Sequence, residues 1–130
     1  IGEQQTISQP YIVAEMTQAL VELGIAYGAL GRHESQERVN REALELEPDM
    51  IEARLGLAVA LFHQDRFEAA VGEFRRVLEH QPDNLRAHYG LGLALLYSGD
   101  REGAIREIAL LNTRSPDLAA ELQRWVFPTD

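Results

Sequence analysis

The 130-residue sequence contains no cysteine and no lysine. Without cysteine, the chain has no disulfide framework, no thiolate nucleophile and no zinc site of the usual sulfur-rich kind. Without lysine, it forms no Schiff base with a carbonyl substrate and carries no Walker lysine for a nucleotide phosphate. All 12 basic residues are arginine, which fits a GC-rich genome and hints at a bacterial source.

Positive charge is also scarce, because 21 acidic residues outnumber the 12 arginines and give a formal net charge of -9. A surface of this sign repels phosphate backbones and anionic membranes, so neither nucleic acid nor a membrane is expected as a partner. No apolar run approaches the roughly 20 residues that span a bilayer, and the first residues show no signal peptide. We therefore expect a cytoplasmic protein.

The sequence offers few groups for catalysis or metal binding. None of the four histidines, His33, His63, His80 and His88, forms a metal-binding pair at i and i+4. The serines fall at expected helix starts or turns, where capping explains them. We expect no catalytic residue, no cofactor and no metal, so the chain is not predicted to be an enzyme.

A repeat of 34 residues organises the chain. The prolines that mark it are Pro48, Pro82 and Pro116, and each is followed by aspartate. A second turn signal stands 17 residues before each proline, at Gly31, Asp65 and Gly99. Each repeat therefore has two helix-length halves, and apolar residues recur within them at helical spacing.

These repeats resemble the tetratricopeptide repeat family, whose pattern has Leu-Gly-x-x-Tyr in the first helix, Ala-x-x-x-Phe in the second and a closing proline. The matching residues are Leu23, Gly24 and Tyr27 in repeat 1, Ala70 and Phe74 in repeat 2, and Leu91, Gly92 and Ala104 in repeat 3. The resemblance covers about residues 17–118. In repeat 1, Gln36 and Asn40 occupy the places of the expected alanine and aromatic residue. This departure weakens the predicted core of the first hairpin, or indicates that its second helix is rotated or covered.

The resemblance implies an all-α solenoid of three helix-turn-helix repeats in one domain of residues 10–130. The expected repeats cover about residues 17–50, 51–84 and 85–118. The first helix is expected to be extended and to begin at Pro10, and a capping helix is expected at about residues 117–127, with Trp125 in the core. Residues 1–9 are expected to be disordered.

Stacked hairpins of this kind curve, so that their first helices line a concave groove. By the resemblance, the peptide-binding residues of the groove are Val21, Ile25, Leu55, Val59, Phe62, His63, Arg86, Tyr89, Leu93, Leu96 and Tyr97. Family members that clamp the carboxylate of chaperone tails use Lys, Asn and Arg. The corresponding residues here are Val21, Ile25, Gly56, Arg86 and Gly90, so only Arg86 could serve. A mostly apolar row takes the place of the clamp.

The leading hypothesis is an adaptor or scaffold module that binds an apolar peptide or helix of another protein in this groove. One alternative is a homo-oligomerisation unit, in which the long first helix and the polar residues of repeat 1 contact a second copy. Another is a chaperone-like holder of apolar segments. The apolar row also has a purely structural interpretation, because bulky residues are common at two of its places in the family and the N-terminal segment could fold over it.

Overall fold

The computed structural model describes residues 10–129, and this part of the chain forms seven α-helices. The helices are α1 (Pro10–Ala29), α2 (His33–Leu46), α3 (Ile51–His63), α4 (Phe67–His80), α5 (Leu85–Ser98), α6 (Arg101–Asn112) and α7 (Pro116–Val126). The predicted all-α solenoid, with a long first helix and a closing seventh helix, is confirmed. The expectation that residues 1–9 are disordered lies outside the described residues.

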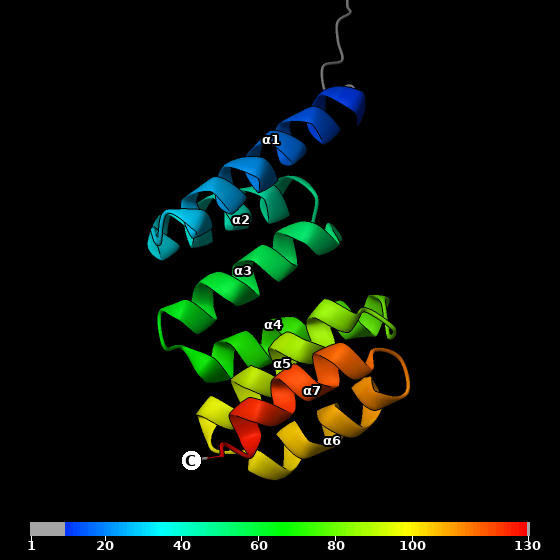
Figure 1. The fold of residues 1–130 in the computed structure, drawn as a ribbon. Coiled ribbons are helices and arrows are strands. Elements are labelled where there is room, and N and C mark those ends of the chain that lie inside the picture. The colour runs from blue at the N-terminus through cyan, green and yellow to red at the C-terminus, as the bar shows by residue number, and fades with distance from the viewer. Residues whose placement is uncertain (1–9, 130) are drawn as a thin grey trace, which may run out of the picture.

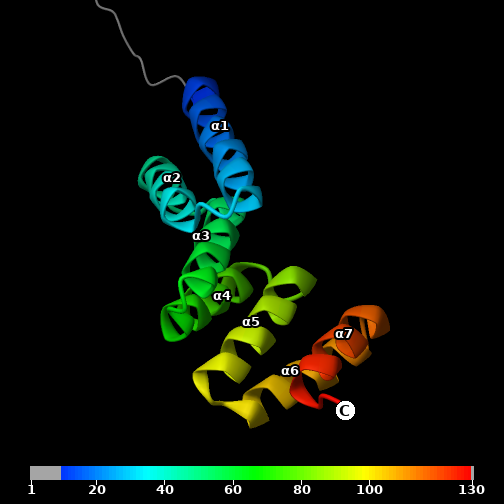
Figure 2. The ribbon, with the colours of Figure 1, turned by 60° about the vertical axis from the view of Figure 1, so that its left-hand side comes forward.

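The helices stack in chain order from α1 at one end to α6 and α7 at the other (Figure 1). Each helix packs against the next, and α1, α3, α5 and α7 also contact one another in sequence. Within the described part of the chain, α2, α4 and α6 make no such contacts with one another. The first helices of the hairpins therefore form a continuous inner layer, and the winding of the stack is visible in the second view (Figure 2).

The turn inside each hairpin has the same backbone geometry. Gly31, Asp65 and Gly99 stand at equivalent positions, and their φ angles are 76°, 62° and 103°. This left-handed conformation suits glycine, and aspartate tolerates it better than most side chains do. It lets the chain reverse within a few residues, so that the two helices of a hairpin pack side by side.

Side chains also fix where three helices begin. The side-chain oxygens of Asn84, Asp100 and Ser115 accept hydrogen bonds from the backbone N–H groups of Ala87, Gly103 and Leu118. Each satisfies a donor that the first turn of a helix leaves unpaired. Each cap therefore stabilises the first turn of its own helix, α5, α6 or α7.

Small residues occupy the closest contacts between helices. Ala58, Ala70 and Ala104 are each 0% exposed. Leucine, valine and phenylalanine side chains fill the space around them.

The expectation that Trp125 lies in the core is wrong, because 54% of this residue is exposed. The core-facing side of α7 carries Ala119, Leu122 and Val126 instead.

None of the described helices is long and apolar enough to cross a membrane.

Candidate functional site

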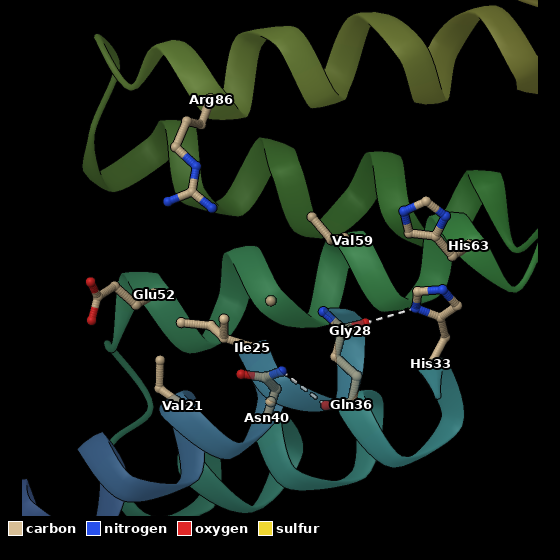
Figure 3. A pocket seen from close by; sticks show the side chains of 12 residues that line it. Val21, Ile25, Gly28, His33, Gln36, Asn40, Glu52, Val59, His63 and Arg86 are labelled. Carbon is tan, nitrogen blue, oxygen red and sulfur yellow. Dashed lines mark hydrogen bonds between the residues drawn. The ribbon is translucent and has the colours of Figure 1, made fainter. Parts of the chain in front are cut away.

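The inner layer contains two adjoining hollows. The first has a volume of about 260 Å³ and lies between the helices of repeat 1 and α3; we call it the polar hollow (Figure 3). The second has a volume of about 290 Å³ and lies between α3 and α5; we call it the apolar hollow. Val59, His63 and Arg86 line both. A single extended ligand could therefore occupy the two hollows together.

Hydrocarbon side chains dominate the apolar hollow. Its apolar lining consists of Leu55, Val59, Phe62, Phe74, Leu93 and Leu118, with Tyr89 beside them. Phe74 reaches this surface because the residue above it is Gly90. A Cβ atom on Gly90 would lie only 2.3 Å from Cζ of Phe74. The hollow therefore suits an apolar side chain, which would leave water on entering it.

A row of rings follows one edge of the groove across the three hairpins. The His33 and His63 rings stack with centroids 4.4 Å apart, and Phe62 meets Tyr97 edge to face at 5.5 Å. Phe67 stacks on Tyr97 at 5.3 Å. Burial lowers the pKa of His63, and the neighbouring His33 lowers it further. His63 is therefore neutral at physiological pH, which keeps this edge of the groove free of its charge.

The floor of the polar hollow is made by two carboxamides from α2. Gln36 is 5% exposed and Asn40 is 2% exposed, and both line the hollow. The Nδ2 group of Asn40 donates to the backbone oxygen of Gln36 at 2.9 Å. His33 Nδ1 lies 2.9 Å from Gln36 Oε1, to which it donates in its Nδ1-protonated form. Neither bond uses Asn40 Oδ1 or Gln36 Nε2, and no other described residue pairs with these two atoms.

Three glycines make room for these amides. A Cβ atom on Gly24 or Gly56 would lie 2.7 Å from Asn40 Nδ2, and one on Gly28 would lie 2.9 Å from Gln36 Nε2. The repeat explains why this space exists. Asn40 is equivalent to Phe74, and Gly56 is equivalent to Gly90. Repeat 1 keeps the glycine that accommodates a ring but places a smaller carboxamide beneath it.

Charged residues stand at the rim. Glu52 from α3 and Arg86 from α5 both line the polar hollow, and Figure 3 shows them at the end opposite the His33 and His63 rings. Both residues are exposed. Their charges are of opposite sign, so the rim has no strong preference for an anion or a cation.

Most of the expected peptide-binding residues lie on these surfaces. All of them except Leu96 and Tyr97 line one of the two hollows. Val21 and Leu55 are only 4% exposed, so they present little surface to a ligand. The role of the expected residues in peptide binding remains a prediction. The sequence did not single out Gln36 and Asn40 as site residues, although their departure from the repeat pattern was the signal that could have identified them.

A buried pair outside the groove is structural. His88 Nδ1 lies 2.6 Å from Glu107 Oε1, and His88 Nε2 lies 2.8 Å from the carbonyl oxygen of Pro82. The imidazole thus joins α5, α6 and the turn before α5. Across residues 10–129, no group of three or more potential metal-ligating side chains gathers.

The outward face of α1 is apolar. Its exposed residues follow alternating steps of four and three, and we call them the α1 stripe: Ile12, Met16, Ala19, Leu23 and Ala26. The last three are equivalent to Ala53, Leu57 and Ala60 of α3, which are 0%, 2% and 0% exposed. In repeat 2, α3 uses this face to pack against α1 and α2 of the preceding repeat, whereas on α1 the same face is exposed.

Two tetratricopeptide repeat profiles match the chain, one over residues 61–125 and the other over residues 21–79. The first covers half of the sequence. These matches agree with the 34-residue period, the paired helices and the continuous inner layer of the structure. The chain belongs to the tetratricopeptide repeat family.

Solved tetratricopeptide structures superpose closely on it. The first such domain of human RPAP3 has a TM-score of 0.79 at 18% identity, covering 85% of this chain and 89% of that one. The first repeat domain of Spaghetti (RPAP3), bound to the HSP90 peptide SRMEEVD, gives 0.80 at 17% identity, with coverage of 86% and 90%. YrrB, described as a protein with an unusual peptide-binding site, gives 0.76 at 24%, covering 83% of this chain and 57% of YrrB. At these identities the likeness shows the fold alone.

A short segment also resembles a curated protein. Over 24 residues, the chain is 88% identical to a protein-L-isoaspartate O-methyltransferase from Desulfosudis oleivorans. The match spans 18% of this chain and 11% of that protein. A match this short does not show what activity this chain has.

Proposed function

We propose that this domain is an adaptor that binds an apolar segment of another protein in its concave groove. The observation that supports the proposal most strongly is the apolar hollow of about 290 Å³ on the inner layer. This hollow is lined by the apolar side chains of Val59, Phe62 and Leu93, which are partly exposed. A partner side chain that entered it would remove apolar surface from water on both molecules.

The relatives support peptide binding but not the same ligand chemistry. Spaghetti was solved with a peptide that carries several acidic residues and ends in aspartate. At the places that clamp such a carboxylate in the family, this chain keeps only Arg86. We therefore expect recognition to depend on apolar anchors, and affinity to change little between low and moderate salt.

The proposal can be tested with peptides selected from a displayed random library against the purified domain. The test variant carries Val59→Glu and Leu93→Glu in the apolar hollow. The matched control carries Ile105→Glu and Leu110→Glu, which place the same charges at exposed apolar positions of α6. We expect the selected peptides to lose at least 10-fold in affinity for the test variant and less than 2-fold for the control. Equal affinity for the parent and both variants would remove the groove from consideration.

Folding must be checked separately, because Val59 and Leu93 also pack partly against the core. Thermal melting of each variant gives this check. If the double variant melts early, Ile25→Glu provides a second test, since this residue lines the polar hollow and is 66% exposed. A peptide that spans both hollows should bind this single variant more weakly.

Self-association is the second candidate function, and the α1 stripe favours it. In the later repeats the same face is buried against helices, and an exposed apolar stripe of this spacing suits a partner helix. The occupant we consider is α1 of a second copy, packed antiparallel. Light scattering at several concentrations should show a dimer that Leu23→Glu converts to a monomer. A parent chain that stays monomeric throughout would exclude this candidate.

A further inference from the structure

Resting on the proposed groove function, we infer that the polar hollow recognises an uncharged amide group of the bound peptide through Asn40 and Gln36. Both side chains are at least nine-tenths buried, and each has a polar atom without a protein partner in the described part of the chain. A buried polar atom that lacks a hydrogen bond is costly, so these atoms favour a ligand that supplies one.

The hydrogen bonds inside the hollow determine what the ligand must offer. Asn40 is oriented by its bond to the Gln36 carbonyl, because the flipped amide would place two oxygens against each other. Its Oδ1 is therefore a free acceptor. The Gln36 amide turns Oε1 toward His33 Nδ1, so when Nδ1 carries the proton it donates to Oε1 and the Nε2 group of Gln36 is a free donor. The floor thus presents one acceptor and one donor.

An amide matches this pair better than a charged group does. Its N–H donates to Asn40 Oδ1 and its C=O accepts from Gln36 Nε2, whereas a carboxylate has no donor for Asn40 and an ammonium has no acceptor for Gln36. The rim adds no net charge, since Glu52 and Arg86 are of opposite sign. The amide can come from an Asn or Gln side chain of the peptide, or from its main chain.

The position of the hollow adds a second requirement. Because both hollows share Val59, His63 and Arg86, an apolar anchor in one places the neighbouring residues of the same peptide over the other. The selected ligands should therefore combine an apolar residue with an amide at a fixed separation. The apolar hollow binds the apolar anchor of the peptide, and the polar hollow binds the neighbouring amide.

The test variant gives repeat 1 the residues that repeat 2 has at the equivalent positions. The double change Gln36→Ala and Asn40→Phe gives repeat 1 the residues of Ala70 and Phe74, and Gly56 leaves room for the ring as Gly90 does for Phe74. This variant removes both free polar atoms and fills the hollow, while the apolar hollow keeps its lining. It should fold and melt at or above the parental temperature, because apolar packing replaces buried amides that lack partners. A lower melting temperature would show that the amides are needed for folding, and would contradict the inference.

The binding experiment uses peptides selected against the parent from the displayed library. We expect the double variant to bind them about 10-fold more weakly than the parent does. If the amide is a side chain, the peptides share an Asn or Gln whose change to Asp or Glu weakens binding to the parent alone. If it belongs to the main chain, N-methylation of one peptide bond has the same effect. In either arm, the side-chain NH₂ signals of Gln36 and Asn40 should shift in the NMR spectrum.

The two proposals fail in different ways. Peptides that bind the parent and the Gln36→Ala, Asn40→Phe variant equally, yet lose affinity for Val59→Glu with Leu93→Glu, would overturn the amide site and leave the groove intact. Water would then supply the missing hydrogen bonds to Gln36 and Asn40. Peptides that are insensitive to both double variants would overturn the groove itself, and the amide site with it.

Discussion

At the residue scale, the tightest packing occurs where glycine lets neighbouring helices approach. A Cβ atom on Gly92 of α5 would lie 2.4 Å from Cδ2 of Leu122 and 3.3 Å from Cβ of Glu107. Leu122 is fully buried, so its side chain cannot move aside without disturbing α7. By contrast, nothing lies within 4 Å of a Cβ atom added to Gly72 of α4, which is exposed.

These two glycines give a matched prediction. Gly92→Ala should destabilise the domain, because overpacking costs about 1–3 kcal/mol and outweighs the gain in helix propensity. Gly72→Ala should stabilise it by about 0.5–1 kcal/mol, since only the gain in propensity applies. Urea unfolding of both variants gives the two free energies. If Gly92→Ala were as stable as Gly72→Ala, the packing of α5 against α6 and α7 described above would be wrong.

Glu37 gives a prediction about pH. Burial acts to raise its pKa, but the hydrogen bond from Gln64 and the interactions with Arg41 and Arg66 outweigh it, so the folded-state pKa is lowered from 4.5. The unfolded chain then binds more protons, and stability rises with pH. The stabilising effect of Glu37 is present above pH 4.5 and is lost as the pH falls through the lowered folded-state value. The melting temperature of Glu37→Gln should therefore lie below that of the parent at pH 7, by at most a few degrees.

The difference in melting temperature between parent and Glu37→Gln should narrow as the pH falls from about 5 toward about 3. Arg38→Gln is a suitable control, because Arg38 faces Glu42 in an exposed pair at 3.8 Å. A difference that stays constant or widens in acid would contradict the role assigned to Glu37.

At the scale of the helices, the two ends of the array differ. Leu122 and Val126 of α7 join the same apolar cluster as Ile108 and Leu111 of α6. Solenoids need such terminal units to cover the last apolar face. At the other end, the α1 stripe remains uncovered within residues 10–129. The surface proposed for self-association therefore lies at the N-terminal end of the array.

Removing residues 115–130 should expose the apolar side of α5 and α6. The shortened chain is expected to melt earlier and to be less soluble than the parent, because buried leucine and isoleucine side chains become accessible. Solubility and circular-dichroism melting provide the measurement. Trp125→Ser is the control, and it should change solubility and melting temperature little, because 54% of this residue is exposed and it is not one of the buried residues of α7. A shortened chain that behaves like the parent would show that α7 is not a cap.

The sequence predicted the helices better than it predicted the site. The period of 34 residues places each turn, and the spacing of small and apolar residues determines which helix faces meet. Trp125 was misplaced because α7 begins at its proline, whereas α5 begins three residues after Pro82, so the helix faces do not follow the repeat count. The repeat pattern marks Gln36 and Asn40 as unusual residues, but it does not show that they border a hollow. The hollow arises because a carboxamide is smaller than the phenyl ring that its neighbouring glycines could accommodate.

At the scale of the whole molecule, the inner layer brings residues from three hairpins onto one surface. Arg86 of α5 reaches both hollows, and His33 of α2 stacks on His63 of α3. No single hairpin contains the groove, so its shape depends on how neighbouring repeats pack. Mutations between hairpins should therefore affect binding even where they touch no ligand.

The central claim is that the inner layer is the binding surface, and photocrosslinking tests it most directly. A selected peptide would carry a benzophenone amino acid in place of its apolar anchor, and the crosslinked residues would be identified by mass spectrometry. The account predicts crosslinks to α3 and α5 around Val59 and Leu93, and their loss when unlabelled peptide is added in excess. Crosslinks that unlabelled peptide suppresses but that lie only on the outer faces of α2, α4 and α6 would contradict this claim.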